Sequence, residues 1–152
     1  MIHLDKLRTS ADGNVHVSLK GRIEADFDGE AIRRALKGHK VALHMGEVQV
    51  MTSVGVITFE RFVDSLPPGT EVVLLHISSV VAAVLGLLPG LRAKVKVESA
   101  RLPFLCRRCG EQRVQSIPYF HGAESDHAPL SECGARMELD GLAEQYLPMG
   151  AG

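Results

Sequence analysis

The chain has 152 residues, of which 45% are hydrophobic, and its formal net charge at pH 7 is −1. This length fits one domain, or one domain of about 100 residues with a small appendage. The near-neutral charge argues against a dedicated nucleic-acid binder, which normally carries a basic excess. Three cysteines are an odd number, which argues against a disulfide framework.

The first residues carry charges and no apolar core segment, so we expect no secretory signal and a cytoplasmic location. Residues 72–91 run without a formal charge and could be mistaken for a membrane span. Their first part is a β-branched run of strand length, and Ser78 and Ser79 are good helix caps. We interpret the stretch as a buried strand leading into a buried helix that Pro89 and Gly90 end.

Residues 2–100 alternate between strand and helix patterns. Period-two alternation indicates strands at 2–8 and 15–23, and apolar residues on one helical face indicate helices at 27–36, closed by Gly38, and at 52–66. Short apolar runs indicate strands at 40–45 and 71–77, and 92–102 is typical of an edge strand. This order predicts an α/β fold with a mixed, mostly parallel sheet.

From Leu102 onward the periodicity disappears, and we expect mostly loop there. The segment Met137–Pro148 mixes apolar and acidic residues, which indicates a short terminal helix that folds back onto the domain or a neighbour. We therefore divide the chain into a domain at 1–100 and an extension at 101–152.

The element order, with "MTSVGV" between the third strand and its helix, resembles the STAS domain of anti-sigma factor antagonists. In that family a phosphorylated serine lies two residues before a glycine at the start of this helix. The resemblance implies that Ser53 is the phosphorylation site and that Gly55 is the family's glycine, while Thr52 stands where the family has aspartate. It also implies a kinase-like anti-sigma factor as the partner.

Ser53 has two interpretations that do not depend on the family. A phosphate at a helix N-terminus gains backbone N–H donors, but it also places about two negative charges on a docking surface. Alternatively, Thr52 or Ser53 caps the helix and stabilises it by about 1 kcal/mol.

Enzymatic activity has little support in the sequence, and we expect none. The G-x-G-x-x-G and P-loop phosphate motifs and the G-x-S-x-G elbow are all absent. His44 and His76 end or interrupt predicted strands, which favours buried or capped histidines over a catalytic base.

The extension contains a possible metal site. Cys106-Arg107-Arg108-Cys109-Gly110 has the C-x-x-C-G spacing with which two thiolates from one tight turn reach a metal. Cys133-Gly134 is half of a second such turn, with Leu130 at the position of the fourth ligand. The extension thus resembles a zinc ribbon that has lost one cysteine.

Several completions of this site remain open. His127 could supply the fourth ligand on a flexible loop, with His121 as the second choice and Asp126 as a poorer match for a thiolate-rich site. Alternatively, no metal binds and the Leu130 side chain packs in the space that the metal would occupy. In a third alternative, water completes the shell of an open, enzyme-like zinc site.

The sequence therefore predicts a non-enzymatic protein-interaction module of bacterial signalling that docks through the surface around Thr52 and Ser53. A structural variant is self-assembly through the same surface. The rival is a nucleic-acid or transcription-associated ribbon that contacts phosphates through Arg107 and Arg108. The acidic residues of the same segment offset these arginines, so we favour a protein partner.

Overall fold

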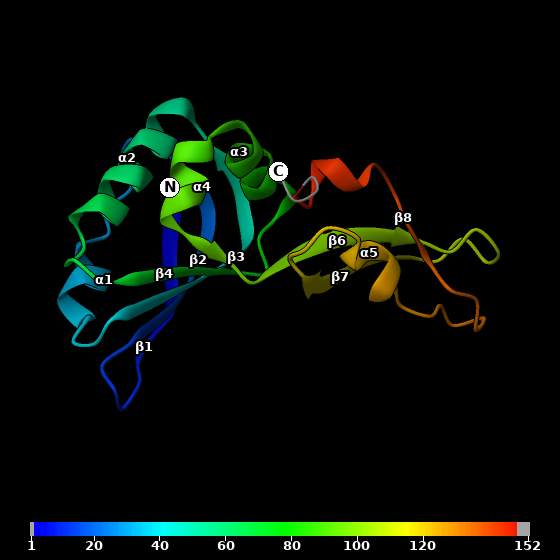
Figure 1. Ribbon diagram of the computed structural model, residues 1–152, viewed down its shortest axis with the longest axis horizontal. Coiled ribbons are helices and arrows are strands. Elements are labelled where there is room, and N and C mark those ends of the chain that lie inside the picture. The colour runs from blue at the N-terminus through cyan, green and yellow to red at the C-terminus, as the bar shows by residue number, and fades with distance from the viewer. Residues whose placement is uncertain (1, 149–152) are drawn as a thin grey trace.

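The computed structural model describes residues 2–148, which form two sheets and several short helices (Figure 1). The first sheet has the strand order β1-β2-β3-β4-β5. Its strands are β1 Ile2–Thr9, β2 Val15–Ile23, β3 Lys40–Met51, β4 Glu71–Leu75 and β5 Lys96–Val97. β1 pairs with β2 in an antiparallel hairpin, and all other pairs are parallel. The prediction of a mixed α/β fold with a mostly parallel sheet is confirmed.

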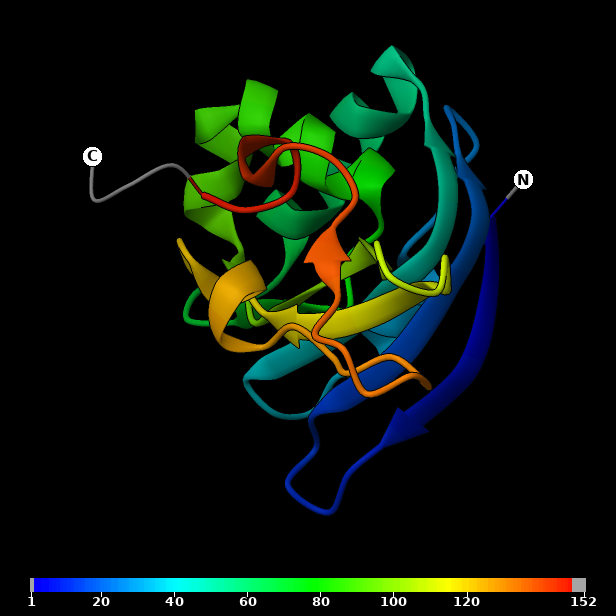
Figure 2. The same cartoon turned by 90° about the vertical axis from the view of Figure 1, so that its right-hand side faces the viewer.

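Helices cover one face of this sheet, and the other face is more open (Figures 1 and 2). The helices are α1 Glu30–Ala35, α2 Ser53–Ser65, α3 Ser79–Leu87 and α4 Pro89–Lys94. Along β2 the residues Val15, Val17 and Leu19 are buried, while the residues between them are partly exposed. This period-two burial places the apolar side chains of β2 toward the helices.

Three boundaries differ from the sequence prediction. The first helix ends at Ala35 because Leu36 is already extended, and Gly38 instead donates its N–H to the Gly13 carbonyl at 2.8 Å. The helix α3 ends before Pro89, as predicted, but Pro89 also begins a further helix, α4, since proline is well suited to the first position of a helix. Because α4 continues to Lys94, the expected edge strand at 92–102 is reduced to Lys96–Val97 in the first sheet.

The apolar stretch 72–91 divides into most of β4, all of α3 and the start of α4, as a strand followed by helical structure was expected to do. Within residues 2–148, no helix has both the length and the apolar character needed to cross a membrane.

The chain after Val97 is more ordered than predicted. β6 Ser99–Leu105 and β7 Gln112–Pro118 form an antiparallel hairpin, and β8 Glu138–Leu139 pairs with the end of β6. We refer to this second sheet, with the helix α5 Ala123–Asp126, as the ribbon, which extends away from the first sheet in Figure 1. The β6–β7 hairpin was not predicted from the sequence, whereas most of the other described residues after Leu102 lie in turns and loops, as expected.

The end of the described chain returns to the first sheet's helices. Ala143–Gln145 form a single 3-10 turn, η1, which contacts α3, and Leu147 is 4% exposed. The prediction that the tail folds back is confirmed, although its helix is only one turn long.

Gly55 lets α2 lie directly against the end of β2. A Cβ atom at this position would lie 2.0 Å from the Ile23 carbonyl oxygen, which is backbone and cannot rotate away. The first turn of α2 therefore requires a residue without a side chain here.

We expect Gly55→Ala to lower the free energy of unfolding by about 1–3 kcal/mol, because the added methyl group overpacks a rigid contact. Thermal unfolding followed by circular dichroism measures this change. Gly86→Ala is the matched control: Gly86 is in α3 with open space around it, so alanine should stabilise the helix by about 0.5–1 kcal/mol. Equal effects of the two substitutions would contradict the contact assigned to Gly55.

Candidate metal centre

Two tight turns of the ribbon bring the three cysteines together. The first knuckle, Cys106–Glu111, joins β6 to β7, and the second knuckle, Ser131–Ala135, precedes β8. In each, the glycine after the last cysteine has a positive φ, +79° for Gly110 and +85° for Gly134, which a residue with a side chain adopts only with strain.

The thiol positions suit a metal ion. The Sγ atoms of Cys106, Cys109 and Cys133 all lie within 4.8 Å of one another, and those of Cys106 and Cys133 are 3.7 Å apart. Four ligands placed tetrahedrally at a zinc–sulfur distance of about 2.3 Å have sulfur atoms about 3.8 Å apart. These three residues could therefore hold a metal ion with little rearrangement.

The site is partly open to solvent. Cys106 is 1% exposed at the end of β6, whereas Cys109 and Cys133 are exposed. A hydrogen bond with the Ser131 hydroxyl and a second from the Cys109 backbone N–H lower the pKa of the Cys106 thiol from 9.0 to about 6. Cys106 is therefore largely a thiolate at neutral pH, which is the form that binds metal.

The structure does not bring the predicted fourth ligands into this group, which consists of the three cysteines within the described residues. His127 is exposed at the end of α5, with its ring 5.7 Å from that of Phe120. His121 is exposed in the turn before α5, and Asp126 is exposed at its end. Leu130 is 62% exposed and forms a β-bridge with Arg136, so it does not pack in a vacant ligand position.

A side chain that the sequence analysis did not consider lies at the cysteines instead. Ser131 is 6% exposed, and its Oγ is 3.0 Å from the Sγ of Cys133. The sequence did contain a signal for Ser131 as a member of the site: Ser131 and Cys133 are spaced like the two cysteines of a C-x-C pair, with serine in place of the first cysteine.

Several arginines of the ribbon, including Arg107 that was predicted to contact phosphates, are paired with the ribbon's own acids or with backbone. Arg107 pairs with Glu138, and Arg113 pairs with Glu111 at 2.6 Å. Arg101 donates to the Gly46 carbonyl at 2.9 Å instead of facing a common surface with them. Arg108 is exposed, and one exposed arginine is little charge for binding a phosphate backbone.

The other predicted site is the start of α2, where Thr52 and Ser53 have different environments. Thr52 is the helix cap: its side-chain oxygen accepts from the Gly55 N–H at 3.0 Å. Ser53 follows it as an exposed residue in the first turn. Val54 and Ile57 on the same helix are 54% and 51% exposed.

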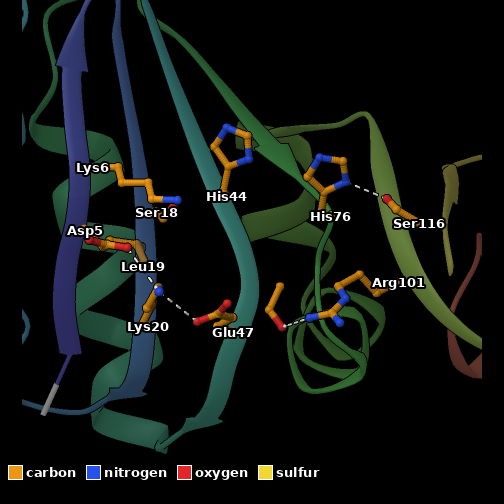
Figure 3. Close-up of a pocket in the computed structure, with 11 residues that line it drawn as sticks. Asp5, Lys6, Ser18, Leu19, Lys20, His44, Glu47, His76, Arg101 and Ser116 are labelled. Carbon is orange, nitrogen blue, oxygen red and sulfur yellow. Dashed lines mark hydrogen bonds and ion pairs between the residues drawn. The ribbon is translucent and has the colours of Figure 1, made fainter. Parts of the chain in front are cut away.

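A polar hollow of about 340 Å³ lies between the open face of the first sheet and the ribbon (Figure 3). Its charged groups are mostly satisfied within the protein, because Lys20 pairs with Asp5 at 3.1 Å and with Glu47 at 3.2 Å. The His76 Nδ1 is 2.5 Å from the Ser116 Oγ, which joins the end of β4 to β7. These contacts give the hollow a structural role at the junction of the two sheets.

The His44 ring lies 5.5 Å from the His76 ring in the same hollow. Partial burial and the neighbouring His76 and His16 lower the pKa of His44. His44 therefore favours its neutral form, as expected for a histidine on a partly covered strand.

In comparisons with known proteins, the chain matches no protein-family model, and no curated protein matches it significantly.

We expect the protein to bind one thiophilic divalent ion per chain, tested with zinc and cobalt(II). Cys109→Ser should weaken binding by at least about tenfold, because it replaces one of three thiolates. Cys109 is exposed, so the thermal unfolding of the first sheet should change little. Unchanged metal affinity in Cys109→Ser would contradict the assignment of the site.

Proposed function

We propose that the chain is a non-enzymatic protein-interaction module of bacterial signalling, in which a STAS-like domain docks a protein partner through the start of α2. The proposal rests on one observation: Ser53, Val54 and Ile57 are exposed together on the first turns of this helix. We refer to these three residues as the α2 docking face. Val54 and Ile57 are three positions apart and therefore neighbours on the helix surface, where a partner could bury both.

The capping geometry supports a switch at Ser53. Because Thr52 already caps the helix, the cap does not depend on the Ser53 hydroxyl. A phosphate on Ser53 would lie at the positive end of the helix dipole and leave α2 folded. It would also place about two negative charges beside Val54, where they oppose the burial of apolar surface. Phosphorylation would thus release a partner without unfolding the domain.

The partner that the STAS resemblance implies is a kinase-like anti-sigma factor, and self-association through the same face is the alternative. The proposed ion in the ribbon is zinc, because thiolates are soft ligands that select zinc over hard cations. Its role is structural: it joins the two knuckles at the end of the ribbon, far along the chain from the α2 docking face.

The proposal is tested by capturing partners from native cells with the wild type, Ser53→Asp, Ser53→Ala and Ile57→Asp, followed by mass spectrometry. We expect the wild type and Ser53→Ala to recover an ATP-binding, kinase-like protein that both aspartate variants lose. Ser125→Asp is the matched control, since it adds the same charge at an exposed serine of α5.

Recovery of the same proteins by all baits would contradict the switch and the α2 docking face together. Loss with Ile57→Asp but not with Ser53→Asp would keep the docking face and remove the switch. Recovery of nucleic acid in a salt-sensitive manner, lost in an Arg107→Ala/Arg108→Ala variant, would favour the rival function instead.

A further inference from the structure

The backbone hydrogen bonds of the second knuckle identify which of its residues is equivalent to Cys106 in the first knuckle. In the first knuckle, Cys106 donates its N–H to the Glu111 carbonyl at 2.8 Å and accepts from the Gly110 N–H at 2.8 Å. In the second, Ser131 makes the corresponding pair of bonds, donating to Ala135 at 2.9 Å and accepting from Gly134 at 3.0 Å. The two turns thus share one hydrogen-bond pattern, and the second is one residue shorter.

This correspondence assigns equivalent positions to the ligands. Cys133 matches Cys109, because each directly precedes a glycine with positive φ. Ser131 matches Cys106, because each opens its knuckle and is buried. The position of the missing cysteine is therefore 131 rather than 130, and the C-x-x-C spacing assumed from the first knuckle does not apply to the second.

The Ser131 side chain faces the thiols. Among the described residues, Ser131 is the only polar or charged residue that is buried as a whole, with 6% of its surface exposed. Its Oγ is 3.0 Å from the Cys133 Sγ, which in turn is 3.7 Å from the Cys106 Sγ. A buried hydroxyl normally satisfies its hydrogen bonds with backbone or water, whereas this one contacts a sulfur atom of the three-cysteine group that could hold a metal ion.

We propose that the Ser131 hydroxyl oxygen is the fourth ligand of the metal centre, which is a three-thiolate, one-oxygen site for a zinc-class cation. On binding, the thiols that are still protonated lose their protons to solvent, and the serine hydroxyl keeps its proton. Three thiolates and one neutral oxygen around a divalent ion give the centre a charge of −1. This inference is independent of the α2 docking face.

The required movement is small. With zinc–oxygen and zinc–sulfur distances of about 2.1 Å and 2.3 Å, a tetrahedral site separates the oxygen from each sulfur by about 3.6 Å. The Ser131 Oγ is 3.0 Å from the Cys133 Sγ, so it must retreat by about 0.6 Å when a metal replaces the hydrogen bond. A rotation of the side chain within its knuckle is sufficient.

The test measures the affinity for zinc by competition with a chromophoric chelator, and the ligand set by the d–d absorption bands of the cobalt(II) form. Ser131→Cys should tighten zinc binding by about 100-fold and shift the cobalt bands toward those of a four-thiolate site. Ser131→Ala should weaken zinc binding by about tenfold. Circular dichroism confirms that each variant is folded.

Two variants are matched controls. Leu130→Cys adds a thiol one residue before Ser131, at a side chain that is 62% exposed. His127→Ala removes the histidine that is nearest to Ser131 in the sequence. Both should leave the affinity and the cobalt spectrum unchanged. A loss in His127→Ala equal to that in Ser131→Ala, or a four-thiolate spectrum in Leu130→Cys, would overturn the proposal. The proposal would also be overturned if both Ser131 variants kept the cobalt absorption bands of the wild type. It would equally be overturned if the wild type bound no metal.

Discussion

The backbone pairing between Ile77 and the start of β6 is the constraint on which the rest of the structure depends. Ile77 donates its N–H to the Ser99 carbonyl at 3.1 Å and accepts from the Arg101 N–H at 2.9 Å, which forms a parallel bridge to Ala100. β6 is thereby anchored at the edge of the first sheet before it pairs with β7. The buried residues of the ribbon therefore belong to the same hydrophobic cluster as those of the first sheet.

The register of β6 carries this anchoring to the metal centre. Ala100, Leu102 and Phe104 are each at most 1% exposed, and the residues between them are only partly buried. Because side chains alternate along a strand, Cys106 falls on the same buried face and is also 1% exposed. The core packing thus fixes the orientation of the first thiol, and the hydrogen bonds of the two knuckles position the others relative to it.

The sequence predicted most of the first sheet because its elements follow their ideal periods. β2 alternates in burial along its length, and α2 has a cap residue, an apolar face and a proline after its end. The strand predicted at 92–102 covers only the first part of β6, because Pro103 interrupts the pattern, and β7 was missed because polar residues dominate it, although the mutual pairing of β6 and β7 satisfies both backbones. The helix α4 was missed because Pro89 both follows the end of one helix and begins the next.

The metal site shows a different limit of sequence reasoning. The three cysteines could be identified from spacing, but the fourth position depends on which backbone groups the second turn pairs, and a turn one residue shorter moves that position from Leu130 to Ser131. Only the hydrogen-bond pattern distinguishes the two. The STAS resemblance and the docking role of Ser53 remain predictions.

The shared core also explains how a hydroxyl can stand where a thiolate would bind more tightly. A free-standing zinc ribbon depends on its metal for folding, so each ligand contributes directly to stability. Here Leu102, Phe104 and Met137 are buried in the same core as the first sheet, and β6 and β7 pair along seven residue positions. Burial of such side chains contributes about 1.5–3 kcal/mol each, and this stabilisation of the ribbon does not come from the ion. The metal then needs only to fix the two knuckles relative to each other, and a weaker oxygen ligand is sufficient for that task.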